Sequence, residues 1–571
     1  MSLRAVTLSE GRTVSRDFDG SFDRECDICV IGLGTAGAIS AIAAAKRGAR
    51  VIGVDLSPIP GGVGTSACVW DYYYGASGGL YKQINSTANE IAGSGNYLNS
   101  TKPGYKRSYI TPVKSLALER NFANYGVECY YRAFVTEVIL DGDRVCGAII
   151  FDGEESIRIG AKVIIDGAEG AVCRLLGLKE LGGRRSDNKS ARFSRTVGVM
   201  YNGMLLGRWC FCEDYAGTTP EEAARMTFRW ATEPPCLVGR FDERSRLYAT
   251  GCEMGRREVP CIETERVYTF EDYLAGVRYD NAVFYSFSPL DNANPDIWNE
   301  DEDFQDWQLL CGMHAYGVSV GIPPECLIPK GMGGLVLAGK HIGTGHTMTS
   351  TVRMRTDIEK CGEAAGVLAA MMIERGESAL TIAREHFDEL AAALTESGCL
   401  DKSNDRGVCD LNVPDGEMWK SCRLPEEYDE LRQTLASIHP SLGLYAVRIA
   451  KDNRAGLADT LAGWLGSEKL LRENSAVALG LLGDRRAARV LRDILRGECE
   501  VYVYESPAKY HFGWLYTTEL CNYIKAACLL GRVGDESDLE LLGSVAAYDG
   551  DDQRRRKAAE YAKASLLKLK K

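Results

Sequence analysis

The pattern of apolar and polar positions is clearest between residues 27 and 55. An apolar run over residues 27–31 predicts a buried strand that ends at Gly32. An Ala-rich segment with helical spacing closes at Gly48, and a second apolar run over residues 51–54 ends in the carboxylate of Asp55. The pattern therefore predicts a strand, a glycine turn, a helix and a second strand, which together begin an α/β unit.

The glycines of this unit, Gly32, Gly34 and Gly37, have the spacing that suits a dinucleotide. Gly32 permits a tight turn, Gly34 lets backbone N–H groups approach a pyrophosphate, and Gly37 lets the helix pack close to the strand. The helix N-terminus then faces the phosphates with its partial positive charge. Asp55, 18 residues after the last glycine, is placed to bond a ribose hydroxyl. The motif serves FAD and NAD alike.

Later segments carry further local signals. The predicted elements are a helix over 111–125, a strand over 126–131, a hairpin turn at 141–144, strands over 161–166 and 334–337 that each lead into a glycine turn, and a helix that starts at a capping box over 356–359 and ends at Gly376. Residues 402–423, with Asn, Gly, Pro and Cys, are typical of a loop.

A second glycine group follows Asp55 after four residues, where an NAD-binding unit normally starts another crossover. This order resembles the FAD-dependent oxidoreductases of the glutathione-reductase-like superfamily, and within it a bacterial branch related to the flavoproteins of fumarate reductase and succinate dehydrogenase. The segment 334–376 is similar to the family's C-terminal flavin motif, with Arg353 nine residues before Gly362. The resemblance implies FAD as the cofactor, although NAD stays open. It implies cofactor contacts from Gly32, Gly34, Thr35, Ala36, Gly37, Asp55, Gly61, Gly62, Gly64, Thr65, Val135, Asp166, Gly170, Gly339, Lys340 and Gly362.

The chain is too long for a single core, so we expect several domains. The expected fold class is α/β: a Rossmann-like FAD-binding domain over 22–185 and 326–394, with a β-rich α+β substrate domain inserted at 186–325. A linker over 395–430 then leads to an all-α domain over 431–571. In that domain residues 479–484 and 530–535 repeat a Gly-Asp turn between helical patterns and resemble HEAT-type repeats, with an inserted loop over 500–515.

Composition narrows the function classes. The net charge of -12 argues against a general nucleic-acid surface. No stretch approaches the roughly 18 apolar residues that span a bilayer, and residues 1–20 hold no apolar signal core, so we expect a cytoplasmic protein. The 20 cysteines are scattered, and only Cys26 and Cys29 show CxxC spacing, which predicts free thiols and no metal site.

Four residues are candidates for catalysis. His341 and His346 lie in the flavin-motif loop, where a histidine titrating near neutral pH would serve as a base, or would fix the loop through backbone bonds. Arg353 would bind a substrate carboxylate or brace the loop. Tyr109 belongs to a polar-aromatic cluster suited to a sugar or carboxylate, and equally to a surface loop. Cys68 is a site for covalent flavin or, more simply, buried filler.

These observations lead to three hypotheses. The first is a FAD-dependent oxidoreductase that transfers a hydride from an alcohol or amine carbon of a small polar substrate to flavin N5, with an electron acceptor that the sequence leaves unknown. The second is reduction of an activated C=C bond, with Arg353 as clamp or proton donor. The third is a scaffold in which the flavin is structural and the helical repeats bind a protein partner.

Overall fold

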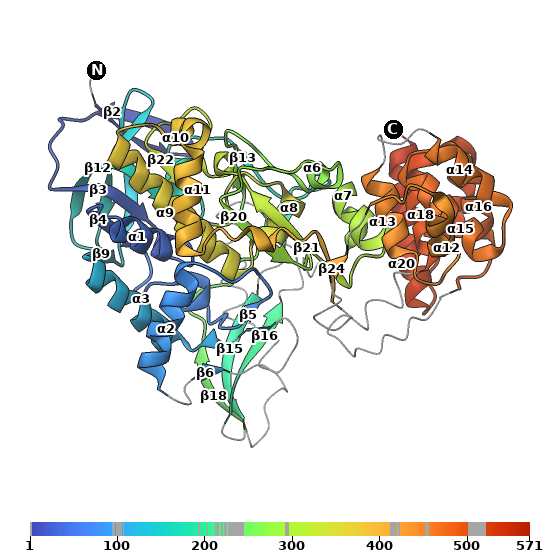
Figure 1. Ribbon diagram of the computed structural model, residues 1–571, viewed down its shortest axis with the longest axis horizontal. Coiled ribbons are helices and arrows are strands. Elements are labelled where there is room, and N and C mark those ends of the chain that lie inside the picture. Colours follow the sequence, from blue (N-terminus) through green and yellow to red (C-terminus); the bar gives the residue numbers. More distant parts are fainter. Residues whose placement is uncertain are drawn as a thin grey trace.

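The computed structural model describes residues 3–93, 97–98, 105–106, 108–191, 194–201, 204–211, 216–217, 221, 225, 245–291, 296–411, 419–420, 423–450, 456–500 and 521–570. The chain forms two lobes (Figure 1), one built around a β-sheet and one built from the helices that follow residue 428. The predicted combination of an α/β sheet domain with a helical C-terminal region is confirmed.

A nine-stranded sheet forms the centre of the first lobe. Its parallel part runs β12–β3–β4–β9, with β22 on the other side of β12, and its antiparallel part continues from β12 through β11, β10, β1 and β2. The bounds are β1 (Arg4–Ser9), β2 (Arg12–Asp17), β3 (Arg24–Ile31), β4 (Val51–Asp55), β9 (Glu128–Tyr131), β10 (Phe134–Asp141), β11 (Arg144–Phe151), β12 (Ser156–Asp166) and β22 (Leu335–Leu337). The predicted hairpin turn at 141–144 is confirmed, with Gly142 at a φ of 64°.

Helices cover this sheet and connect its parallel strands. The helix α1 (Gly37–Lys46) joins β3 to β4 and is buried along almost its whole length, which only small residues allow. The helix α9 (Arg355–Arg375) packs directly on α1, and α2 (Leu80–Ala92) and α3 (Thr111–Tyr125) lie beside them. The bounds of α3 confirm the predicted helix over 111–125 at both ends.

The predicted capping box at 356–359 is wrong. The helix α9 begins one residue earlier, its N-cap residue is Met354, and no side chain caps it. The reason is that Glu359 bonds elsewhere: its carboxylate accepts hydrogen bonds from the Tyr72 hydroxyl at 2.6 Å and from the Lys114 ammonium. These long-range side-chain bonds of Glu359 replace the local capping bond that the sequence predicted.

Two smaller sheets are built mainly from the region between the flavin segments, and the second also takes in two strands that follow residue 394. One runs β16–β15–β18 and the other β20–β21–β23–β24. Their bounds are β15 (Ser194–Tyr201), β16 (Met204–Phe211), β18 (Ser245–Thr250), β20 (Phe284–Ser288), β21 (Tyr316–Ile322), β23 (Val408–Asp410) and β24 (Trp419–Lys420). The expectation that 402–423 is loop throughout is wrong, because β21 offers an edge to which β23 pairs. Three-residue strands such as β23 carry too little periodicity to be recognised from sequence.

The described part of the second lobe is helical. The two Gly-Asp turns each connect helices, α15 (Lys469–Leu481) to α16 (Ala488–Arg496) and α18 (Asn522–Val533) to α19 (Leu539–Ala546). Asp484 and Asp535 accept hydrogen bonds from backbone N–H groups of the short 3-10 helices that begin the second member of each pair. The helix α20 (Gln553–Leu569) packs on α18 and α19. The loop expected over 500–515 lies, apart from Glu500, outside the described residues.

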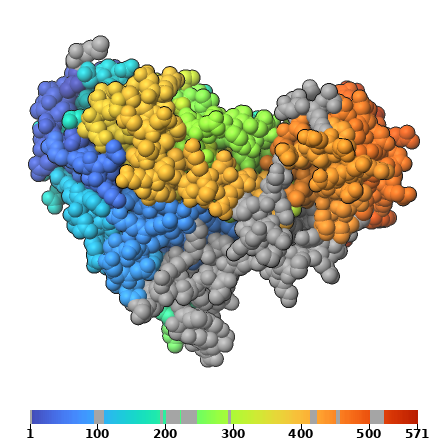
Figure 2. Space-filling model, in the orientation of Figure 1, coloured from blue at the N-terminus to red at the C-terminus, as the bar shows by residue number. Residues whose placement is uncertain are grey.

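The helical lobe is attached through buried charges. Asp306, in a π-helical turn of the first lobe, accepts hydrogen bonds from Arg448 at 2.6 Å and from Arg532 at 2.5 Å. The ring centroid of Trp307, its neighbour, lies 5.3 Å from that of Tyr445 in an edge-on contact. Figure 2 shows the helical lobe, in orange and red, meeting the first lobe beside its green surface. The two lobes therefore share a specific, charged and aromatic interface.

Candidate functional site

The first glycine turn has the geometry that its spacing predicted. A Cβ at Gly32 would lie 2.6 Å from the backbone nitrogen of Ala168, and one at Gly37 would lie 2.9 Å from the carbonyl carbon of Gly32. No side chain fits at either position. A Cβ at Gly34 would touch only the carbonyl oxygen of Gly167, at 4.0 Å. The backbone at Gly34 therefore borders open space, as the approach of a pyrophosphate requires.

The second glycine group lies against the first. The backbone N–H of Gly61 donates to the carbonyl of Leu33 at 2.8 Å, and the Thr35 hydroxyl donates to the carbonyl of Gly61 at 3.2 Å. A Cβ at Gly62 would lie 2.9 Å from the Cα of Gly34. The loop that follows Asp55 is thus folded back onto the turn that precedes α1.

The C-terminal flavin motif reaches the same place from far along the chain. A Cβ at Gly362 would lie 2.8 Å from the carbonyl carbon of Ala36 and 2.9 Å from its Cα. One turn later, a Cβ at Gly366 would lie 3.0 Å from the Cα of Ser40. Glycines at these two positions let α9 contact α1 backbone to backbone. Three segments separated by up to about 300 residues therefore converge on one turn.

Asp55 lies at the carboxyl end of β4, beside this turn. Its two carboxylate oxygens accept hydrogen bonds from the backbone N–H groups of Leu33, at 2.5 Å, and Ser57, at 2.7 Å. Burial raises the pKa of Asp55 to about 6, although these two bonds oppose the shift. The carbonyl of Asp55 also accepts a bond from Ala133, two residues before Val135 in β10. The structure therefore brings Asp55 and the Val135 segment together.

Arg355 ties the second glycine loop to α9. Its Nη1 atom donates to the carbonyls of Val69, at 2.9 Å, and Trp70, at 2.7 Å, and its guanidinium stacks 4.0 Å from the centroid of the Tyr72 ring. The Thr111 hydroxyl donates to the carbonyl of Thr65 at 2.7 Å and fixes the loop from the other side. Arg355 was not among the residues that the sequence analysis selected. The only available signal was an arginine in the first turn of a helix whose other face had to be buried.

The glycine turn after β12 carries a second charged group. Lys340 donates to the Glu169 carboxylate at 3.0 Å and to the carbonyl of Arg256 at 2.7 Å, and Arg256 donates to the same carboxylate at 3.2 Å. Burial opposes ionisation of Glu169, but the Lys340 and Arg256 charges outweigh it and lower its pKa to about 2. Asp166 caps the next short helix by accepting bonds from Val172 and Cys173. These bonds hold the Asp166 side chain against the turn.

His341 lies between the glycines of this turn. A Cβ at Gly339 would lie 3.4 Å from the His341 Nδ1 atom, and one at Gly170 would lie 3.8 Å from its Cδ2 atom. The ring is buried, and neither nitrogen has a hydrogen-bond partner among the described residues; Nε2 lies 3.8 Å from an Asp166 oxygen. Burial lowers the pKa of His341, although Asp166 and Glu169 oppose that shift. The imidazole is therefore neutral near pH 7 and able to accept a proton.

His346 has the opposite environment. Its Nδ1 atom lies 2.6 Å from the Glu258 carboxylate and its Nε2 atom 2.7 Å from the Glu300 carboxylate. Burial opposes protonation, but the two glutamates outweigh it and raise the His346 pKa well above its ordinary range. Both ring nitrogens are therefore engaged as donors of an imidazolium. This geometry favours a cross-link between three segments and leaves no nitrogen for a base.

Arg353 and Tyr109 are also placed by the structure. Arg353 donates through Nη2 to the carbonyl of Asp291, and its buried Nε atom has no hydrogen-bond partner in the described part of the chain. Burial and the neighbouring Arg257 charge lower the pKa of Arg353 to about 10. The Tyr109 hydroxyl is buried and donates to α2, at 2.7 Å to Asn89. Tyr109 is thus held within the fold, and its side-chain contacts indicate a packing role.

The converging segments fit FAD. They offer an open backbone at Gly34 and buried polar atoms without a protein partner among the described residues, namely both His341 nitrogens, the Arg355 Nε and the Thr356 hydroxyl. Buried polar atoms of this kind need a partner, which a cofactor with many polar groups provides. Within the described residues, no cluster of three His, Cys, Asp or Glu side chains could hold a metal ion. No helix of that part of the chain is long and apolar enough to cross a membrane.

Comparison with solved structures finds flavoproteins at low similarity. A geranylgeranyl bacteriochlorophyll reductase-like protein from Thermoplasma acidophilum is 15% identical over 82% of this chain and 99% of that chain, with a TM-score of 0.34. The p-nitrophenol 4-monooxygenase PnpA from Pseudomonas putida DLL-E4 is 14% identical over 66% of this chain and 89% of that chain, also at 0.34. THI4 from Thermovibrio ammonificans is 20% identical over 28% of this chain and 67% of that chain, at 0.23. Similarity this low carries no argument about the reaction.

Comparison of sequences is more informative. No curated protein matches the chain. The profile of a family described as "FAD dependent oxidoreductase" matches residues 27–234 and 212–394, which together exceed half of the chain and contain all three converging segments. The match supports FAD as the cofactor. The chain therefore belongs to the family of FAD-dependent oxidoreductases.

Proposed function

We propose that this FAD-dependent oxidoreductase oxidises an alcohol or amine carbon of a small polar substrate, with His341 as the base. The observation that carries the proposal is the state of His341, which is buried, neutral near pH 7 and without a protein partner at either ring nitrogen among the described residues. A base must be deprotonated at the working pH and must have a free lone pair. Of the two candidate histidines, only His341 meets both conditions, because His346 begins the helix α8 (His346–Val352) and both of its nitrogens are engaged.

The residues around the glycine turn would hold the cofactor. The backbone at Gly34 and the N-terminal turn of α1 would bind its pyrophosphate, Asp55 a ribose hydroxyl, and the Gly61 to Thr65 loop, braced by Arg355, the part between phosphates and ring. When bound, FAD supplies the two-electron acceptor of the reaction. His341 would take the proton of the substrate hydroxyl or amine at a ring nitrogen. His346, Glu258 and Glu300 would hold the loop in place.

Anaerobic titration of the FAD-loaded protein tests this proposal. Sugars, hydroxy acids and amines are added in turn, and the loss of visible flavin absorbance is followed. A true substrate bleaches the flavin, and His341→Asn slows the bleaching by about 10²- to 10⁴-fold while FAD content is kept. The matched control is His386→Asn, because His386 pairs with Glu377 and Glu389 at the surface. A His341→Asn variant that reduces its flavin at the wild-type rate would refute the role of His341.

A second candidate function is reduction of an activated C=C bond. It is favoured by Arg353, whose pKa of about 10 makes it a better proton donor than an ordinary arginine. In this direction, enoates would reoxidise the dithionite-reduced protein, and Arg353→Lys would slow that step. Reoxidation by enoates, without bleaching by any alcohol or amine, selects this function over the first.

We further propose a superfamily, domain limits and a repeat type for this chain. The order of the segments supports a place near the glutathione-reductase-like flavoproteins, and the domain limits stay those expected from the sequence, except that β23 and β24 of the expected linker join the β20–β21 sheet. The helix pairs α15–α16 and α18–α19, each turning at Gly-Asp, support a short HEAT-type array. Its attachment through Asp306 favours a fixed lobe over an independent scaffold. A protein partner captured only when residues after Glu426 are present, without redox turnover, would favour the scaffold instead.

A further inference from the structure

Two cysteines of the helical lobe hold their sulfur atoms close together. Cys499 follows the last residue of α16 by three positions, and Cys521 is the N-cap residue of α18. Their Sγ atoms are 3.5 Å apart. This separation is about 1.5 Å longer than a disulfide bond, so a small movement of either side chain would allow one to form.

The two thiols differ in a way that suits sequential chemistry. The hydrogen bond from Cys499 lowers the pKa of the Cys521 thiol, and the backbone N–H groups of Tyr523 and Ile524 at the start of α18 act in the same direction, against the effect of burial. The same hydrogen bond and burial raise the pKa of the Cys499 thiol. Thiolates are the reactive form of cysteine. The position of Cys521 at the N-terminus of α18 assigns it as the nucleophile, against the contact of its Sγ atom with the Glu500 carbonyl at 3.1 Å. Cys499, whose Sγ atom is 3.5 Å away, is the thiol that can respond to it.

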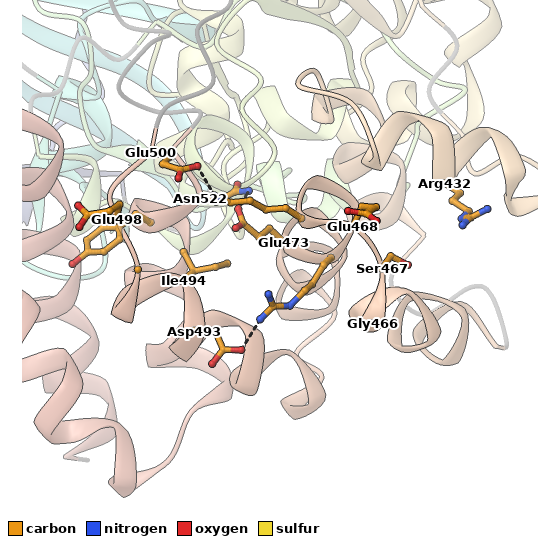
Figure 3. A pocket seen from close by; sticks show the side chains of 14 residues that line it. Arg432, Gly466, Ser467, Glu468, Glu473, Asp493, Ile494, Glu498, Glu500 and Asn522 are labelled. Atoms are coloured by element: carbon orange, nitrogen blue, oxygen red, sulfur yellow. Dashed lines mark hydrogen bonds and ion pairs between the residues drawn. The ribbon is translucent and has the colours of Figure 1, made fainter.

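A cavity lies beside the residues that flank the pair. It has a volume of about 620 Å³ and is lined by Glu498 and Glu500, the neighbours of Cys499, and by Asn522 and Tyr523, which follow Cys521 (Figure 3). Some charged side chains of the wall are paired, such as Arg472 with Asp493 at 2.5 Å. Cys521 itself is fully buried and Cys499 is half-buried. Because Cys521 is fully buried, a small oxidant such as a peroxide suits the pair better than a bulky one.

We propose that Cys499 and Cys521 form a reversible dithiol–disulfide site that hydrogen peroxide oxidises. The Cys521 thiolate attacks one peroxide oxygen, an S–O bond forms, the O–O bond breaks, and the departing hydroxide takes a proton to become water. Cys499 then attacks the Cys521 sulfur, an S–S bond forms, the S–O bond breaks, and the second hydroxide takes the Cys499 proton. Two thiols and one peroxide thus give one disulfide and two waters, and a thiol reductant reverses the change.

The other close cysteine pair provides an internal comparison. Cys26 and Cys29 lie in β3, both are buried in the core of the first lobe, and burial together with their mutual hydrogen bond raises the pKa of Cys29 well above its ordinary value. This pair has CxxC spacing but neither a lowered pKa for Cys29 nor a place beside the cavity. We expect it to stay reduced under the same treatment. The surface thiol of Cys252 reports whether peroxide is present in effective amount.

Peptide mapping of the full-length, FAD-loaded protein tests the proposal. The protein is treated with hydrogen peroxide, quenched, digested without reductant and analysed by mass spectrometry. The expected result is a Cys499–Cys521 cross-link that disappears on adding a thiol. In Cys499→Ser, Cys521 stops at the sulfenic acid, which dimedone traps, and in Cys521→Ser the Cys499 thiol is not oxidised. The matched control is Cys146→Ser, because Cys146 is also half-buried and has a raised pKa.

Each outcome decides the matter. The cross-link in wild type and in Cys146→Ser, together with its absence from both serine variants, supports the proposal. Oxidation of Cys252 while Cys499 and Cys521 remain thiols overturns it, and so does a cross-link that joins Cys521 to any other cysteine. Flavin absorbance and circular dichroism confirm that each variant is folded. The test involves neither His341 nor a substrate, so it is independent of the proposed oxidation.

Discussion

Substituting Gly362 by alanine tests the contact on which the cofactor site depends. The added Cβ would lie 2.8 Å from the carbonyl carbon of Ala36, whereas carbon atoms in contact are about 3.5 to 4.0 Å apart. The helix α9 must therefore move away from α1 by about 1 Å. Overpacking of this size typically costs about 1 to 3 kcal/mol. If this cost opposes the FAD-bound arrangement, the dissociation constant for FAD rises by about 5- to 150-fold.

The assay is equilibrium binding of FAD to flavin-depleted protein, followed by the quenching of flavin fluorescence. Gly543→Ala is the matched control, since Gly543 lies in α19 with no heavy atom within 4 Å of an added Cβ. A helical glycine replaced by alanine gains about 0.5 to 1 kcal/mol of stability, and FAD binding should not change. Wild-type affinity in Gly362→Ala would refute the claim that the contact between α1 and α9 shapes the cofactor site.

Three further predictions follow from buried charges. The stabilisation from His346 is fully present below its ordinary pKa of 6.5 and is lost as pH rises through its raised folded pKa. His346→Gln should therefore lower the free energy of unfolding by about 3 to 5 kcal/mol at mildly acidic pH and by less at alkaline pH. A difference in unfolding free energy that does not vary with pH would contradict this. Asp306→Asn should destabilise the attachment of the helical lobe by a similar free energy and speed proteolysis between the lobes. Asp459→Asn at the surface should change stability by less than about 0.5 kcal/mol. Equal proteolysis rates in the two variants would count against the role of Asp306. Binding of FAD should tighten as pH rises through about 6, because a ribose hydroxyl donates to the ionised Asp55; an Asp55→Asn variant with the same pH dependence would exclude that contact.

The sequence predicted those parts of the fold that local patterns determine. The turn at Gly32 to Gly37, the helix at 111–125 and the hairpin at 141–144 depend on glycine placement and on short-range periodicity, and all three appear as expected. The two glycine groups and the distant Gly362 were also expected to serve one cofactor. The structure places these segments in contact, because small residues at matching positions allow no other close packing.

Long-range side-chain contacts could not be predicted in the same way. His346 looked like a possible base, but Glu258 and Glu300, 88 and 46 residues away, hold both of its nitrogens. Glu359 suited a capping box, but Tyr72 and Lys114 bind it instead. Arg355 could not be identified from the sequence, because its partners are backbone carbonyls, which no residue pattern marks. Each case depends on which distant segment arrives nearby, and that information is absent from local sequence.

Hydrogen exchange measured by mass spectrometry tests the central claim most directly. The claim is that the glycine turn near residue 34 and the N-terminal half of α9, around residue 362, hold the same FAD molecule. Flavin-depleted and reconstituted protein are compared peptide by peptide. The account predicts that FAD slows exchange in both segments together and at one equivalent per chain. Protection of only one segment, or of neither, would contradict it.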